Sequence, residues 1–133
     1  MVLVDARGLP VAIDVAPADA HESRCVQALL DFMLTSEAPT RVIGDKAYDS
    51  DKLDEELAQR GVEMIAPHRG NRKPENVTQD RRPLWRAKRR WTVERTISWI
   101  QNYRRLCIRW EKSSQLFSGF LHMTCTLLLL SEV

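Results

Sequence analysis

The sequence predicts a mixed α/β fold in a single domain. Short runs rich in β-branched residues alternate with segments in which apolar residues recur every three or four positions. The predicted order is strand, strand, helix, strand, helix, strand, followed by helices. A length of 133 residues fits one domain with its own core. Strands that alternate with helices favour parallel pairing, in which each strand–helix–strand step makes a right-handed crossover.

The first two strands form a predicted β-hairpin over residues 1–5 and 10–16. Gly8 supplies the turn geometry between them. The chain enters the first strand directly, so we expect a preceding segment that this sequence lacks. Residues 20–33 carry apolar side chains at helical spacing and are expected to form the first helix.

The centre of the chain repeats the alternation. Residues 41–45 form one predicted buried strand, and residues 62–66 form the next. Between them lies a helix that begins at an acidic and hydroxyl cluster and ends at Gly61. Three aspartates are interpreted as its cap and first-turn charges. They are Asp49, Asp51 and Asp54.

Charge divides the chain into two halves. Residues 1–68 hold 6 Lys and Arg against 13 Asp and Glu, a net charge of −7. Residues 69–112 hold 14 against 4, a net charge of +10, and residues 113–133 add −1. The overall charge of +2 therefore conceals a strongly basic block. A block of one sign indicates a polyanionic partner.

The chain from residue 68 onwards contains three predicted segments. Residues 68–83 form a basic loop, residues 84–112 a basic helical region, and residues 114–131 a buried apolar helix. In the basic helix, Val93, Ile97 and Ile100 are the expected buried stripe.

Three scattered cysteines indicate neither a disulfide framework nor a zinc site, and they fit a reducing, cytoplasmic setting. The first residues lack the pattern of a signal peptide. The longest apolar stretch, residues 116–130, is interrupted and short for a bilayer, so no membrane partner is expected.

Two carboxylates are candidate metal ligands. Asp45 falls where a central strand ends, the usual edge for chemistry in an α/β sheet, and Gly44 before it leaves room for a ligand. Glu94 lies in the basic helix. Acids brought together in this way can hold two divalent ions for phosphoryl transfer. The simpler alternative is that Glu94 forms an ion pair with Arg90, one turn earlier.

Four segments resemble the IS5/IS4-type DDE transposases of bacterial insertion sequences. They are residues 44–50 (GDKAYDS), 66–69 (APHR), 90–95 (RWTVER) and 103–106 (YRRL). The resemblance covers nearly the whole chain. It implies an RNase H-like mixed sheet with flanking helices, and DNA cleavage and strand transfer with Mg²⁺ or Mn²⁺.

The resemblance also implies roles for single residues. Asp45 matches the second Asp, and Glu94 the Glu, of the family's Asp–Asp–Glu triad. Ala87 and Gln101 stand where the family has a DNA-contacting Tyr and Lys, whereas Arg90 matches the family's basic residue. The candidate DNA contacts are Arg86, Lys88, Arg89, Arg90, Arg95, Arg104 and Arg105.

The first Asp of the triad has no counterpart here. In the family it lies on the first strand, upstream of the hairpin, and we interpret Asp5 and Asp14 as turn and surface charges. The chain is therefore expected to be the C-terminal part of a catalytic domain that lacks its first strand and is nearly inactive alone. An isolated chain of this kind would form oligomers or be complemented by an upstream transposase fragment.

Two alternatives remain open. One is a DNA-binding remnant without catalysis. The other is a metal-dependent nuclease that uses Asp45, Glu94 and another local acid.

Overall fold

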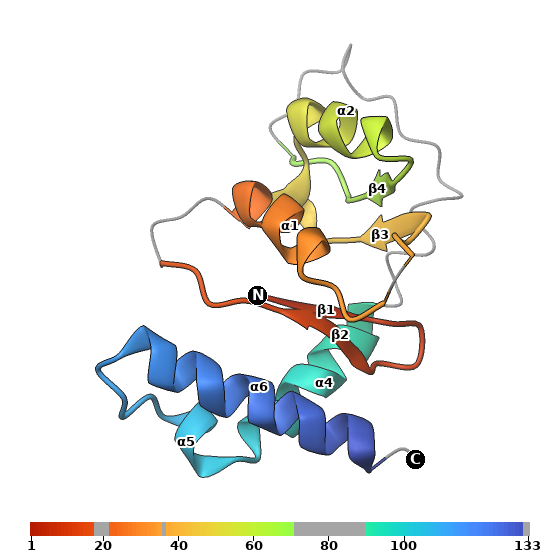
Figure 1. The fold of residues 1–133 in the computed structure, drawn as a ribbon. Coiled ribbons are helices and arrows are strands. Elements are labelled where there is room, and N and C mark those ends of the chain that lie inside the picture. Colours follow the sequence, from red (N-terminus) through yellow and green to blue (C-terminus); the bar gives the residue numbers. More distant parts are fainter. Residues whose placement is uncertain (18–21, 36, 71–89, 132–133) are drawn as a thin grey trace.

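The structure, a computed structural model, describes residues 1–17, 22–35, 37–70 and 90–131. The elements are β1 (Val2–Val4), β2 (Pro10–Ile13), α1 (Glu22–Asp31), β3 (Arg41–Ile43), the 3-10 turn η1 (Lys46–Tyr48), α2 (Asp51–Gln59), β4 (Glu63–Ile65), α4 (Trp91–Gln101), α5 (Arg104–Cys107) and α6 (Ser114–Leu130) (Figure 1). This order confirms the predicted mixed α/β class. Residues 71–89, which hold most of the predicted basic loop and the start of the predicted helical region, lie outside the described residues.

The four strands form two separate pairs. β1 pairs with β2 in antiparallel orientation, and β3 pairs with β4 in parallel orientation. The predicted hairpin and the predicted parallel β3–α2–β4 unit are therefore confirmed. β1 and β3 are not hydrogen-bonded to each other, so the described strands do not form one continuous mixed sheet.

The hairpin turn is stabilised by Asp5, in agreement with its interpretation as a turn charge. The Asp5 carboxylate accepts hydrogen bonds from the backbone N–H groups of Arg7 at 2.9 Å and Leu9 at 2.8 Å. Gly8 has a φ of +92°, a conformation that favours glycine. Partial burial raises the pKa of Asp5, but the two backbone hydrogen bonds and the Arg7 guanidinium outweigh it and hold that pKa below its ordinary value.

One core lies around the β3–β4 pair. Leu53 and Leu57 on α2 are 2% and 0% exposed, and they pack against Val62 and residues of α1 and β3. The side chain of Ser50 caps α2 by accepting from the Leu53 N–H at 3.5 Å, and Gly61, with a φ of +73°, follows its end. These contacts confirm the predicted start and end of the helix.

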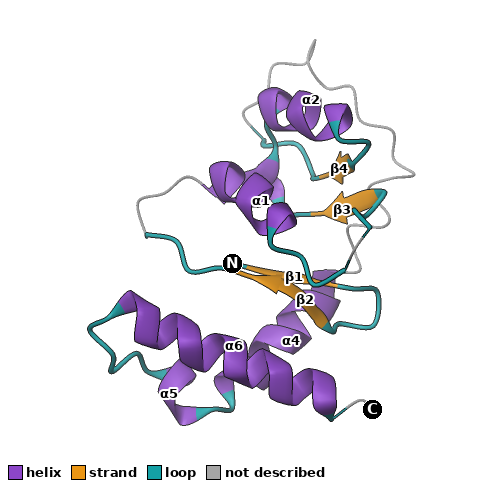
Figure 2. Cartoon of the chain, viewed as in Figure 1, coloured by secondary structure: helices purple, strands orange, loops and turns teal. Residues whose placement is uncertain are grey.

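A second core joins the hairpin to the helices after it. Ile13 on β2 packs against Ile100 on α4 and against Leu121 and Cys125 on α6. Figure 2 shows these helices next to the β1–β2 pair. Burial raises the pKa of the Cys125 thiol to about 11.

The predicted buried stripe of α4 is wrong in two of its three positions. Thr92, Thr96 and Ile100 are the buried residues of this helix, whereas Ile97 is 39% exposed and Val93 is half-buried. The Thr96 hydroxyl donates to the Gly8 carbonyl, so a polar contact rather than an apolar stripe seats the helix on the hairpin turn.

Helix α6 is buried on one side only. Leu121, Thr124 and Cys125 are buried, whereas Leu116 and Leu130 are 61% and 65% exposed, so the expectation of a buried helix is only partly met. No helix in the described part of the chain is long and apolar enough to cross a membrane.

Candidate active site

A groove of about 860 Å³ lies between the two strand pairs. β1 and β3 supply its two strand walls, and α1 and α4 contribute apolar side chains to it. Four carboxylates also line it, those of Asp5, Glu37, Asp45 and Glu94. The fold thus brings Asp45 and Glu94, the two predicted metal ligands, to a single groove.

Asp45 is positioned by the turn that follows β3. It is half-buried and caps η1, and its Oδ1 accepts a hydrogen bond from the Ala47 N–H at 2.7 Å. A Cβ at Gly44 would overlap Cε of Met64 and lie 2.7 Å from Cδ2 of Tyr48. The structure therefore gives Gly44 a different role from the predicted one, because neighbouring side chains fill the space beside it.

Hydrogen bonds join the segment after β4 to η1 and to Asp49, which follows η1. We call these contacts of His68 and Arg69 the Asp49–His68 brace. Nδ1 of His68 lies 2.8 Å from Oδ1 of Asp49, and Oδ2 of Asp49 accepts from the Arg69 N–H at 2.7 Å. The Arg69 guanidinium also donates to the carbonyls of Lys46 at 3.0 Å and Ala47 at 2.8 Å.

This brace corrects the interpretation of Asp49. Its side chain is only 5% exposed and binds His68 and the Arg69 backbone, whereas Ser50 provides the cap of α2. Sequence reasoning missed His68 and Arg69 as residues that support the site. A signal was available, since both belong to one of the motif segments that carry the resemblance.

Glu94 lies in the first turn of α4 with 66% of its side chain exposed. Its Oε1 is 3.7 Å from a terminal nitrogen of Arg90, so the ion pair considered from the sequence is present. Exposed pairs of this kind stabilise a protein by about 1 kcal/mol or less. Because this ion pair is weak, the Glu94 carboxylate remains available to bind a divalent cation.

The donor set fits a hard cation. Carboxylate oxygens are the ligands that Mg²⁺ prefers, and Asp45 and Glu94 both offer them. Asp5 is a weaker candidate, because its carboxylate already accepts hydrogen bonds from two backbone N–H groups and from the Arg7 guanidinium. Among the described residues, no group of three or more His, Cys, Asp and Glu is placed to hold a metal ion. Within the described ranges, Asp45 and Glu94 are therefore the two candidate ligands.

Arg95 is held by contacts within the protein. Its guanidinium lies between the rings of Trp91 and Trp99, 5.0 and 4.7 Å from their centroids, and donates to the Arg7 carbonyl. Cation–π contacts on two sides fix its orientation. The structure thus places Arg95 where it joins α4 to the hairpin turn.

The other candidate DNA-contacting residues differ in whether contacts within the protein already engage their side chains. Arg104 is exposed on α5, whereas Arg105 pairs with Glu111 at 2.7 Å and lies 4.9 Å from the centroid of the Phe120 ring. Arg86, Lys88 and Arg89 lie outside the described residues.

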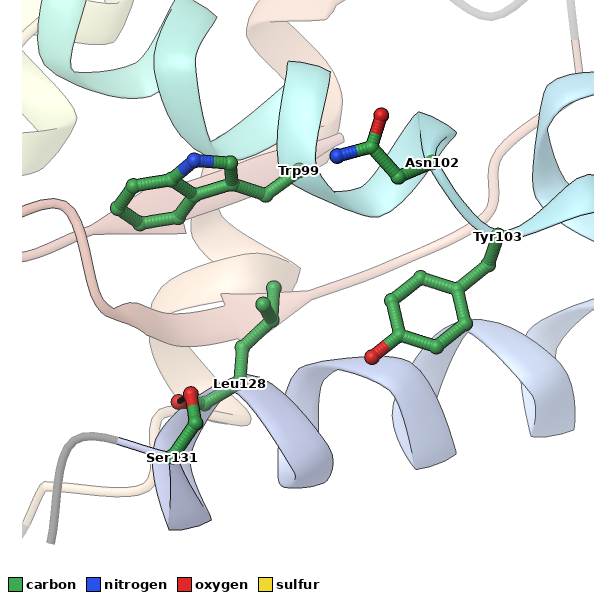
Figure 3. A pocket seen from close by; sticks show the side chains of 5 residues that line it. All are labelled: Trp99, Asn102, Tyr103, Leu128 and Ser131. Atoms are coloured by element: carbon green, nitrogen blue, oxygen red, sulfur yellow. Dashed lines mark hydrogen bonds between the residues drawn. The ribbon is translucent and has the colours of Figure 1, made fainter.

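A second cavity, of about 350 Å³, lies between the end of α4 and the end of α6. Figure 3 shows Trp99 and Tyr103 beside it, together with Asn102, Leu128 and Ser131. It shares no lining residue with the groove and contains no carboxylate side chain. It therefore offers no support for a metal centre.

Two comparisons relate this chain to known proteins. Residues 1–129 match the family model described as the transposase DDE domain. A Burkholderia cepacia protein named as a transposase for insertion sequence element IS402 is 27% identical over 135 residues, which cover 96% of this chain and 60% of that protein. A Brucella ovis protein named as a transposase for insertion sequence element IS6501 is 33% identical over 128 residues, covering 95% of this chain and 92% of that protein. No solved structure gives a significant match.

Proposed function

Because this chain belongs to the transposase DDE domain family, we propose that it takes part in metal-dependent DNA strand cleavage and transfer during transposition. One observation carries the proposal. Asp45, at the end of a strand, and Glu94, on a helix much later in the chain, line the same groove.

Asp45 and Glu94 would hold Mg²⁺ or Mn²⁺. When bound, such an ion activates a water or hydroxyl and stabilises the leaving oxygen in phosphoryl transfer. The Ala47 N–H orients the Asp45 carboxylate, and the Asp49–His68 brace fixes the turn that carries it. The Arg90 guanidinium would neutralise the Glu94 carboxylate in the absence of metal, and a bound cation would take the place of Arg90.

DNA is the proposed partner of the basic half of the chain. Phosphate contacts by Lys and Arg release counterions and make binding strongly salt-dependent. Among the described candidates, Arg104 is exposed on a helix that contacts α4 and α6. Arg95 and Arg105 contribute indirectly, since their internal contacts position the helices.

We further propose that the domain is RNase H-like and that its metal centre is incomplete in this chain. The described residues offer two well-placed carboxylates, and a triad needs a third from another segment or another polypeptide. Loss of one member of a catalytic unit commonly lowers the rate by several orders of magnitude. The chain alone is therefore a poor nuclease that binds DNA.

Nicking of a supercoiled plasmid with and without Mg²⁺ tests this proposal. We expect tight, salt-sensitive DNA binding and only weak Mg²⁺-dependent nicking, which Asp45→Ala and Glu94→Ala abolish. Glu55→Ala, at an exposed position on α2, is the matched control and leaves the residual nicking unchanged. Residual nicking that survives both substitutions would refute the assigned roles.

The two alternatives give different results in the same assay. A DNA-binding remnant would bind without any Mg²⁺-dependent nicking. A self-sufficient nuclease would cleave efficiently, and its activity would also require another local acid, for which the groove offers Asp5 and Glu37.

A further inference from the structure

The buried apolar side chain of α4 lies away from Glu94. It belongs to Ile100, which packs against residues of β2 and α6. Ile100 comes six positions after Glu94, about 9 Å along the helix axis at about 1.5 Å per residue. Val93 and Ile97 line the groove and are not buried. Apolar packing therefore anchors the end of α4, and other contacts must fix its start.

Polar contacts with the hairpin turn fix the first half of α4. The Arg95 guanidinium donates to the Arg7 carbonyl. The Thr96 hydroxyl donates to the next carbonyl, that of Gly8. A Cβ at Gly8 would lie 2.7 Å from a terminal nitrogen of Arg95 and 3.1 Å from Cγ2 of Thr92. The turn therefore lies directly against this part of the helix, beside which Figure 2 shows the β1–β2 pair.

Arg95 is also held by two residues of its own helix. Its guanidinium lies 5.0 Å from the centroid of the Trp91 ring and 4.7 Å from that of Trp99. Residues four positions apart are neighbours on a helix surface, so these three side chains form one row, and none of them lines the groove. Glu94 precedes Arg95 by one residue, a rotation of about 100° around the helix, and does line the groove.

We propose that Arg95 is a positioning residue for the candidate metal centre. By fastening the start of α4 to the Arg7 carbonyl, it sets the rotation of the helix about its axis and holds the Glu94 carboxylate in the groove that Asp45 also lines. Arg95 acts through Glu94 and does not bind the ion, because a guanidinium only donates. The inference rests on the proposed function, since it takes Asp45 and Glu94 as the metal ligands.

A positioning role and a simple charge effect predict opposite results. Arg95 is a cation one residue from Glu94, and like charges repel, so removal of its charge alone would tighten the binding of a metal cation. If Arg95 holds Glu94 in place, its removal weakens metal binding instead, because groups that orient a ligand contribute about tenfold or more to affinity. The direction of the change in affinity separates the two roles.

Mn²⁺ titrations followed by electron paramagnetic resonance, without DNA, test the inference. Arg95→Met removes the charge and the hydrogen-bond donors, and should weaken Mn²⁺ binding by about tenfold. Arg95→Lys keeps the charge and a donor but lacks the planar fork, and should restore part of the affinity. Arg60→Met is the matched control. Arg60 pairs with Asp31 at 2.7 Å and does not line the groove, so this variant should bind Mn²⁺ like the wild type.

A second background separates positioning from a general loss of structure. Because Arg95 acts through Glu94, Arg95→Met should cause no further loss of Mn²⁺ affinity when it is added to Glu94→Gln. Hydrogen exchange of the metal-free protein gives an independent measurement. Arg95→Met should speed amide exchange in the first half of α4 and leave exchange near Ile100 unchanged, since the apolar core holds that end.

Three results would overturn the inference. They are unchanged or tighter Mn²⁺ binding by Arg95→Met, an equal loss of affinity in the Glu94→Gln background, and unaltered hydrogen exchange at the start of α4. Failure of the proposed function gives a different result, in which Asp45→Asn and Glu94→Gln bind Mn²⁺ like the wild type or the wild type does not bind it. The metal-positioning role would then fall with it, whereas faster exchange in Arg95→Met would still assign the anchoring of α4 to Arg95.

Discussion

Two regions of this chain are held together by different kinds of contact. The β3–β4 region, made of α1, β3, α2 and β4, has an apolar core in which Leu53, Leu57 and Val62 are at most 2% exposed. The hairpin region, made of β1, β2, α4 and α6, has a smaller apolar core and relies on polar contacts at the Gly8 turn. Asp45 belongs to the first region and Glu94 to the second. The geometry of the candidate site therefore depends on how the two regions are joined.

The largest expected effect is in the β3–β4 region. Leu57→Ala removes a fully buried side chain and should lower the free energy of unfolding by about 2–5 kcal/mol. Ile97→Ala, at the groove, should cost much less, because this side chain is 39% exposed. Urea denaturation of both variants measures the difference. Equal losses would mean that the groove face of α4 is packed as tightly as the core.

A smaller effect is expected at the junction of α4 with the hairpin. Thr96→Val keeps the shape of the side chain but leaves the Gly8 carbonyl without its donor, which should cost about 1–3 kcal/mol. Thr126→Val is the control, because that exposed hydroxyl donates only to the His122 carbonyl of its own helix. If both variants unfold at the same urea concentration, the polar junction does not stabilise the hairpin region.

The sequence was sufficient for features with a local cause. Gly8 and Ser50 predicted a turn and a helix cap because each acts on residues within a few positions. It was insufficient for the buried face of α4, since Thr92 and Thr96 are polar by type and are buried only because the hairpin turn packs on them.

The hydrogen bonds of Asp49 that support the candidate site were equally hard to predict from the sequence. Asp49 lies beside a helix start and matches a capping pattern, yet it binds His68, 19 positions later. Asp45 and Glu94 were predictable as candidate site residues because the motif segments around them resemble a known family. Their position on one groove required the fold.

The smallest expected effect concerns the hairpin turn and depends on pH. The pKa of Asp5 lies below its ordinary value of 3.8, so its ionised form stabilises the folded state above pH 3.8. That contribution is lost as pH falls through the lower folded pKa. Asp5→Asn keeps the shape and removes the titration, and it should cost about 1 kcal/mol or less at pH 7, since the carboxylate is partly exposed.

Thermal melts of the wild type and the Asp5→Asn variant between pH 7 and about pH 2 check this prediction, because that range crosses the carboxylate titration. The difference between the two proteins should disappear at the acidic end. A difference that persists there would assign the effect to the shape of the side chain rather than to its charge.

The most direct test of the account is whether Asp45 and Glu94 share one metal centre. Mn²⁺ titrations followed by electron paramagnetic resonance would compare the wild type, Asp45→Asn, Glu94→Gln and the double variant. We expect each single substitution to weaken binding by about tenfold or more and the double variant to bind little worse than either, because groups that act on one ion are not additive. Unchanged affinity in either single variant, or losses that add fully in the double variant, would contradict a shared site.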